Sequence, residues 1–305
     1  MYKLVSKALK DEAPSLFLKK MNFIFTALCC FFLNINSHAQ AQSTPLTISK
    51  TIYGAGEILI PCQLEGMDQS CKLDMGAPFS VFSVEETKDL NVINQIDYVG
   101  VSGISAKCNV VTSTNPVSFG PVSVKDSLFL NCPQRVSRNH LLGLNHLMTR
   151  PFKIDFQEQT FSIFEGTEVL NHEYQVDSSG HVFVKIKLIK ANQEVEVRAM
   201  LDTGAGLTIV SGHLVESLPQ FFTSLGTSHN DVKDTNSNVI QNKMVFISTI
   251  EIDQKRIAIP YSMVMDFTDL KKSIGFDVDM IIGLNVLREL KTLSINPSNA
   301  TWSVQ

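Results

Sequence analysis

The chain has 305 residues, of which 44% are hydrophobic and 18% are charged, with a formal net charge of −4. That length can bury a sizeable core, in one large domain or in two modest ones. The acidic balance, with no basic run, argues against a nucleic-acid partner. No apolar run after the N-terminal region reaches the ~20 residues that span a bilayer.

The N-terminal region has the pattern of an export signal. Lys19 and Lys20 precede an apolar run, and the small residues around Ser37-His38-Ala39 suit a cleavage site before Gln40. We therefore expect residues 1–39 to be a signal peptide region and the rest to be exported, to the periplasm, the cell surface or the medium. A buried first helix is the alternative.

Two further features of this region bear on its processing. Met21 is a second candidate start codon, because the residues before it have no structural pattern of their own. Cys29 and Cys30 raise a lipoprotein alternative, but Leu28 is too bulky for the position before a lipidated cysteine. Residues 1–39 carry a net charge of +3, so the remaining 266 residues carry a charge near −7.

Short β-rich runs, broken by Gly, Pro, Asn and Asp, dominate the remaining sequence. Helical periodicity is scarce and is expected only in short pieces, for example after Ser83 and around Asn285–Leu290. We therefore predict an all-β fold. The runs typical of strands are GEILIPCQL, HVFVKIKLI, EVEVRAMLD, MVFISTIEI and RIAIPYSMVM.

Four cysteines follow the export signal, and in an exported protein they are expected to pair. In the stretch PCQLEGMDQSCKLD, a two-residue turn at Gly66-Met67 would place Cys62 opposite Cys71. We therefore predict a Cys62–Cys71 disulfide, which leaves Cys108 to pair with Cys132. Four buried free thiols are the alternative, because connectivity is not deducible from sequence alone.

Three blocks recur in the same order in two halves of the chain. DMGAPFSVFS, from Asp74, resembles DTGAGLTIVS, from Asp202; LLGLNHL resembles IIGLNVL, and TFSI resembles TWSV. Each first block follows a predicted hairpin. Gly143 lies 69 residues after Asp74, and Gly283 lies 81 residues after Asp202. These similarities indicate an internal duplication.

The duplication predicts an N-terminal lobe over residues 40–165 and a C-terminal lobe over residues 181–305. Residues 166–180 are polar and rich in turn residues, as expected of a linker.

The Asp-x-Gly-Ala block, followed by a hydrophobic-hydrophobic-Gly block, resembles the retropepsin and pepsin aspartic proteases. The resemblance covers nearly all of the chain after the signal, in both halves. It implies a bilobal acid-protease fold of two β-barrel lobes related by a pseudo-twofold axis. Each lobe of that family brings one Asp-x-Gly loop to the floor of a cleft. Leu141-Leu142-Gly143 and Ile281-Ile282-Gly283 match the segments that pack beneath these loops.

The resemblance assigns Asp74 and Asp202 as a catalytic pair for peptide-bond hydrolysis. With no metal and no nucleophilic side chain, water must attack the carbonyl, so the site needs both a base and an acid. Two adjacent carboxyl groups that share one proton supply both. The loop residues expected to support the pair are Gly76, Ala77, Thr203, Gly204 and Ala205.

Two features depart from the pepsin pattern. Ala77 and Ala205 stand where pepsins often carry Ser or Thr, and the loss of a hydroxyl donor is expected to move the working pH toward mildly acidic or neutral values. Met75 stands where the family has Thr, whose hydroxyl bonds across the lobes. Thr203 retains that hydroxyl, and Met75 cannot replace it.

A flap over the cleft is expected in the first lobe at YVGVSGIS, residues 98–105. Gly100 and Gly103 would supply mobility, and Tyr98 a hydrogen-bonding aromatic side chain. A plain surface hairpin is the alternative. The second-lobe counterpart, KDTNSNV, is more polar.

Three functions compete. The first is an exported aspartic endopeptidase that acts on polypeptides as a monomer, because one duplicated chain supplies both carboxyl groups. The second, favoured by Met75, is a weak or inactive homologue that binds extended peptides by strand addition. The third is a structural β-protein, which leaves the similarity of two polar turns unexplained. No metal or cofactor is expected, since the histidines lack metal-ligand spacing.

Overall fold

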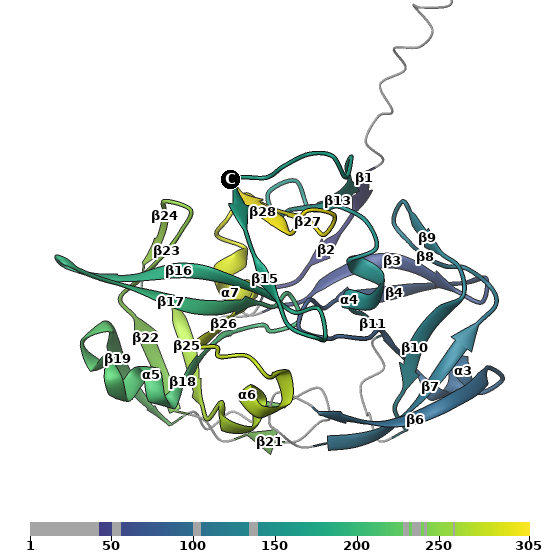
Figure 1. Ribbon diagram of the computed structural model, residues 1–305, viewed down its shortest axis with the longest axis horizontal. Coiled ribbons are helices and arrows are strands. Elements are labelled where there is room, and N and C mark those ends of the chain that lie inside the picture. Colours follow the sequence, from purple (N-terminus) through teal and green to yellow (C-terminus); the bar gives the residue numbers. More distant parts are fainter. Residues whose placement is uncertain are drawn as a thin grey trace, which may run out of the picture. The chain divides into compact units, whose positions relative to one another are not determined.

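The computed structural model describes residues 43–50, 56–99, 105–133, 140–227, 232–233, 239–240, 243–258 and 260–305. β-strands dominate these residues, and the helices are short. The expected all-β, two-lobe fold is confirmed. Most strands of the two halves lie in separate groups, coloured purple to teal and green to yellow, and a few strands of both halves meet in a third group (Figure 1).

Each half contributes one ten-stranded sheet, and the two sheets have corresponding strand orders. The first runs β6 (Asn91–Val99), β7 (Ser105–Ser113), β10 (Ser127–Asn131), β5 (Val81–Phe82), β11 (His140–Leu142), β4 (Met67–Leu73), β3 (Ile58–Leu64), β8 (Val117–Phe119), β9 (Val122–Val124), with β2 (Thr47–Ile48) beside β3. The second runs β19 (Phe222–Thr227), β22 (Lys243–Ile247), β25 (Tyr261–Met265), β18 (Thr208–Ser211), β26 (Met280–Ile282), β17 (Gln193–Leu201), β16 (Val182–Lys190), β23 (Thr249–Ile252), β24 (Lys255–Ala258), with β15 (Gln175–Val176) beside β16. The duplication therefore extends to the topology, strand for strand.

A six-stranded sheet joins the two halves. Its order is β1 (Ser43–Pro45), β13 (Thr160–Ile163), β12 (Phe152–Asp155), β27 (Thr292–Asn296), β28 (Thr301–Val304) and β14 (His172–Glu173). The central pair, β12 and β27, is antiparallel, with Phe152 opposite Ile295. Residues 166–180, expected as a linker, contain the short strands β14 and β15. A separate pair is formed by β20 (Val232–Lys233) and β21 (Val239–Ile240).

The helices are α3 (Val84–Thr87), α4 (Leu144–Leu147), α5 (Gly212–Ser217), α6 (Thr268–Ile274), α7 (Leu284–Leu287) and the 3-10 helix η1 (Pro219–Phe221). The final serine of each Asp-x-Gly block caps the helix that follows it. Ser83 Oγ accepts from the N–H of Glu86 at 3.4 Å, and Ser211 Oγ accepts from the N–H of Leu214 at 3.1 Å. This cap satisfies one of the free N–H groups of the first helical turn.

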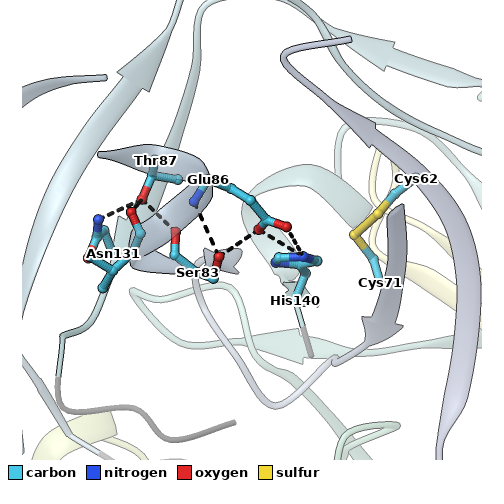
Figure 2. Close-up of polar contacts among 8 residues, drawn as sticks. Cys62, Cys71, Ser83, Glu86, Thr87, Asn131 and His140 are labelled. Atoms are coloured by element: carbon cyan, nitrogen blue, oxygen red, sulfur yellow. Dashed lines mark hydrogen bonds and ion pairs between the residues drawn. A yellow bond between two sulfur atoms is a disulfide. The ribbon is translucent and has the colours of Figure 1, made fainter. Parts of the chain in front are cut away.

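A polar network attaches α3 to β11 (Figure 2). Glu86 accepts a hydrogen bond from Ser83 Oγ at 2.7 Å, and His140 Nε2 lies 2.9 Å from a carboxylate oxygen of Glu86. The His140 ring also stacks on Phe82, with centroids 5.3 Å apart. Because β11 pairs in parallel with β4, this network helps to hold the strand that leads into the first Asp-x-Gly loop.

The Cys62–Cys71 disulfide is confirmed, but the turn that suggested it lies elsewhere. The two-residue turn is Glu65-Gly66, with φ of 50° and 77°, and not Gly66-Met67. Positive φ at both positions defines the type I′ turn that matches the twist of a hairpin. Cys62 consequently faces Gln69, and the disulfide joins diagonal neighbours whose Cα atoms are 5.8 Å apart.

The second expected disulfide, Cys108–Cys132, is also present and attaches β7 to the chain after β10. Both cysteines lie in an apolar cluster of the first half that includes Ala77 and Tyr98. A corresponding cluster in the second half packs against Ala205. The largest cluster is shared by both halves and contains the leucines that precede Asp74 and Asp202. Each Asp-x-Gly loop is thus anchored to the shared core on one side and to its own half's cluster on the other.

Candidate active site

Asp74 and Asp202 emerge from equivalent strands and are held in equivalent ways. Asp74 directly follows β4, and its N–H donates to Leu142 O at 3.0 Å. Asp202 directly follows β17, and its N–H donates to Ile282 O at 3.0 Å. The hydrophobic-hydrophobic-Gly strands β11 and β26 therefore fix the start of each loop, as the family resemblance implied.

The two loops meet, although their sequence positions differ by 128 residues. A Cβ atom added to Gly76 would overlap the carboxylate of Asp202, and one added to Gly204 would overlap the carboxylate of Asp74. Each carboxylate therefore lies directly against the glycine of the opposite loop. Only glycine permits this approach, which explains the glycine in both triplets.

Backbone N–H groups donate to both carboxylates. The N–H of Gly76 donates to Asp74 Oδ1 at 3.1 Å. The N–H groups of Gly204 and Ala205 donate to Asp202 Oδ1 at 2.7 and 3.1 Å. These bonds fix the orientation of each carboxylate within its own loop, and those from Gly204 and Ala205 favour the ionised form of Asp202.

Burial and the negative charge of Asp74 together raise the pKa of Asp202 from its ordinary value of 3.8 to about 7. The hydrogen bonds from Gly204 and Ala205 and the positive charge of Lys72 oppose this rise. Two carboxyl groups this close cannot both ionise easily, so they retain one proton between them. Such a pair can give up and accept a proton near neutral pH.

One side-chain hydroxyl crosses between the loops. Thr203 Oγ1 accepts from the N–H of Met75 and donates to Leu73 O, both at 3.0 Å. The expectation that Thr203 keeps this bond is confirmed. Met75, at the corresponding position of the first loop, has no hydroxyl and cannot make the equivalent two bonds to the second loop. Its side chain is fully buried in the core shared by both halves, so it supports the loop by packing.

The segments beneath the loops contain residues that the sequence prediction missed. Asn145 Oδ1 accepts from the N–H of Ser80 at 2.8 Å, and Asn285 Oδ1 accepts from the N–H of Thr208 at 2.7 Å. Their side-chain amides donate to Leu128 O and to Tyr261 O, at 2.6 and 2.7 Å. The repeated Gly-Leu-Asn of the second block was the available signal.

The glycines of the second block are required by close contacts. A Cβ atom on Gly143 would lie 2.5 Å from the backbone carbon of Phe79, and one on Gly283 would lie 2.5 Å from that of Leu207. The N–H of Gly143 also donates to Ser80 Oγ at 2.9 Å, and that of Gly283 donates to Thr208 Oγ1 at 3.2 Å. Both contacts press the second block against the loop above it.

The flap candidate corresponds to the end of the hairpin formed by β6 and β7. Tyr98 is nearly buried and belongs to the same apolar cluster as Ala77, which places this hairpin beside the first Asp-x-Gly loop. Gly100 and Gly103 lie outside the described residues. In the second half, β20 and β21 flank the polar counterpart KDTNSNV.

Within the described residues, no group of three or more His, Cys, Asp or Glu side chains is placed to hold a metal ion. The helices described are all too short or too polar to cross a membrane. The groups that the described residues bring together at this site are two carboxyl groups and the backbone N–H groups that donate to them.

In sequence, the chain matches no protein-family model and no curated protein. Among solved structures, 405 chains match it. One of these is conglutin gamma, a basic 7S globulin from lupine seeds, with a TM-score of 0.51 and 12% sequence identity. The match covers 87% of this chain and 95% of conglutin gamma. At this identity the likeness concerns the fold alone.

Proposed function

We propose that this protein is an exported aspartic endopeptidase that uses Asp74 and Asp202 as a proton-sharing pair to hydrolyse peptide bonds. One observation carries the proposal: each carboxylate lies against the glycine of the opposite loop, so the two lie together between the two halves. A structural role would not require two buried, like-charged groups to approach one another, because that approach costs stability.

The proposed reaction needs one proton on the pair. The ionised carboxylate takes a proton from water, whose oxygen attacks the peptide carbonyl carbon, while the protonated carboxyl donates to the carbonyl oxygen. The resulting tetrahedral diol collapses when the carboxyl that took the proton from water gives a proton to the nitrogen and the other carboxylate takes a proton from a diol hydroxyl. The C–N bond then breaks, which leaves a carboxylic acid and an amine. The raised pKa of Asp202 supports this sequence, because it keeps one proton on the pair up to about pH 7.

The loop geometry bears on whether Met75 abolishes activity. The hydroxyl of Thr203 holds the first loop at two points, the N–H of Met75 and the carbonyl of Leu73. The Met75 side chain is itself fully buried. We infer that packing at position 75 replaces the second pair of hydroxyl bonds well enough for the carboxyl groups to stay aligned.

Export is proposed on the pattern of residues 1–39, and the two disulfides are compatible with it because such bonds persist in oxidising compartments. The proposed substrates are polypeptides, because the proposed carboxyl pair hydrolyses peptide bonds. The proposed form is a monomer, because one chain supplies both carboxyl groups.

A weak or inactive peptide-binding homologue is the second candidate, and Met75 is the residue that favours it. Conglutin gamma is described as a globulin, which agrees with the general rule that a shared fold does not imply a shared activity.

Cleavage of an unfolded protein distinguishes the two candidates. Purified protein, with and without residues 1–39, would be incubated with the substrate across roughly pH 3 to 8, which brackets a perturbed carboxyl pair. Asp74→Asn and Asp202→Asn would run in parallel. We expect the wild-type protein to cut and both variants to fail. An inert wild-type protein that still binds extended peptides would replace the protease by the binding homologue.

A further inference from the structure

His181 connects the second half of the chain to the first Asp-x-Gly loop. It directly precedes β16, and its side chain is 7% exposed. Its Nε2 atom lies 3.2 Å from the carbonyl oxygen of Gly76, and its Nδ1 atom lies 2.6 Å from Asp177 Oδ2. The backbone N–H of His181 also donates to Asp177 Oδ1 at 2.9 Å. Asp177 thus binds the ring at Nδ1, and Nε2 faces the carbonyl oxygen of Gly76 in the first Asp-x-Gly loop.

Both side-chain contacts of the ring are with oxygen atoms that accept hydrogen bonds. A carbonyl oxygen and a carboxylate can only accept hydrogen bonds, so both contacts are hydrogen bonds only when both ring nitrogens carry protons. A ring that carries both protons makes both bonds, and the carboxylate of Asp177 beside it balances its charge. The side chain of Asp177 is almost completely buried, as expected of a counter-ion matched to a buried charge. Burial alone would raise the pKa of Asp177, but the hydrogen bonds and charge of His181, together with the hydrogen bond from the N–H of Ser179, lower it below its ordinary value.

The contact of His181 is with the first Asp-x-Gly loop, in which Met75 has no hydroxyl to bond to the opposite loop. Thr203 holds the loop at Leu73 O and at the N–H of Met75, but no hydroxyl at position 75 returns those bonds. His181 adds a third point, the carbonyl of Gly76, which immediately follows Met75. Since the N–H of Gly76 donates to Asp74, fixing this residue also fixes the carboxylate.

The residue at this position differs between the two halves. In the first half, Gly56-Glu57-Ile58 corresponds to Gly180-His181-Val182, and each triplet leads into the first strand of its hairpin. Glu57 has the opposite charge, donates its N–H to Ser49 Oγ at 2.9 Å, and its carboxylate lies 3.7 Å from Lys72 Nζ. The second half therefore carries a histidine at this position, and its side chain reaches the loop that contains Met75.

We propose that His181 is a positioning residue that holds the Asp74 loop in register with the Asp202 loop and so compensates for the methionine at position 75. The part that concerns catalysis rests on the proposed function. The part that concerns the loop does not, because it describes a contact within the folded chain.

The test measures the loop and the reaction separately. Hydrogen exchange of the backbone amides would be followed in peptides spanning residues 73–79 and 201–207, in the wild-type protein, His181→Leu and His181→Gln. His213→Leu is the matched control, since His213 is an exposed histidine on α5. The kcat and KM for an unfolded protein substrate would be measured on the same samples, together with thermal unfolding.

We expect His181→Leu to speed exchange in residues 73–79 by roughly tenfold to a hundredfold, the factor that corresponds to one hydrogen bond from a charged donor. Exchange in residues 201–207 should stay unchanged. The kcat should fall by a similar factor with KM within about twofold, because the loop orients the reacting group and not the substrate. His181→Gln, which offers an N–H to Gly76 O, should recover part of both effects, and His213→Leu should show neither.

Unchanged exchange in residues 73–79 of His181→Leu would overturn the proposal, even if the wild-type protein cuts its substrate. Equally faster exchange in both peptides, with a lower melting temperature, would also overturn it, since His181 would then support the fold in general. If the wild-type protein does not cut, the proposed function fails, and the exchange data alone decide whether His181 positions the loop.

Discussion

Thr203 is the residue whose removal most sharply separates the two-loop site from a pair of ordinary turns. Its side chain is fully buried, and its Oγ1 bonds to the N–H of Met75 and to Leu73 O across the two halves. Thr203→Val keeps the shape of the side chain and removes only these two bonds. Two buried backbone groups then lose a partner, at about 1 to 2 kcal/mol each. We expect the free energy of unfolding to fall by about 2 to 4 kcal/mol.

The same change should lower kcat/KM by at least about tenfold, because the first loop loses both of its ties to Thr203 and a small displacement of a reacting group is costly. Thr301→Val provides a matched control. Thr301 is buried, accepts from the N–H of Leu170 at 3.1 Å and donates to Asn299 Oδ1 at 2.6 Å. In urea denaturation, Thr301→Val should lower the free energy of unfolding by about as much as Thr203→Val does, and its kcat/KM should stay unchanged. Wild-type kcat/KM in Thr203→Val, or an equal loss in both variants, would refute the positioning role.

The carboxyl pair, the asparagine beneath the second loop and the two disulfides each give a testable expectation. Because the pKa of Asp202 is about 7 in the folded chain against an ordinary 3.8, the folded state binds more protons than the unfolded state between these values. The free energy of unfolding should therefore fall as the pH rises from about 4 to about 7, and Asp202→Asn should flatten this dependence; denaturant midpoints measured across that range would show an unaltered slope if the pKa is not raised. Asn285→Leu should cost about 2 to 3 kcal/mol in urea denaturation, since the N–H of Thr208 and the carbonyl of Tyr261 both lose the side-chain amide, and a loss below about 0.5 kcal/mol would show that these bonds are replaced. Replacing Cys108 and Cys132 by Ala should destabilise the protein by about 3.5 kcal/mol, against about 2.5 kcal/mol for Cys62 and Cys71, because the first pair closes the longer loop; calorimetry with the opposite ranking would contradict this argument.

The elements that sequence predicted well are those in which local pattern and repetition agree. Asp74 and Asp202 were identified because the same turn occurs twice, and the structure brings both turns together. The hairpins that precede them were expected and are present as β3–β4 and β16–β17. Each depends on alternation and turn residues that are visible within a few positions of the chain.

The features that sequence missed depend on backbone detail or on distant contacts. The turn at Glu65-Gly66 shifted the hairpin register, because Glu65 adopts a positive φ that its residue type does not suggest. MVFISTIEI and RIAIPYSMVM each contain two strands, and α5 and α6 were not among the helical pieces named from the sequence. The contact between His181 and Gly76 spans 105 positions, and the corresponding residue of the first half is Glu57, so no local or repeated pattern could reveal it.

A mutant cycle on the carboxyl pair shows whether Asp74 and Asp202 act together. The kcat/KM for an unfolded protein would be compared among the wild-type protein, Asp74→Asn, Asp202→Asn and the double variant, with folding verified for each. If the two carboxyl groups act as one proton-sharing unit, each single variant should be as inactive as the double variant. A single variant that retains the wild-type kcat/KM, or losses that simply multiply in the double variant, would contradict the account.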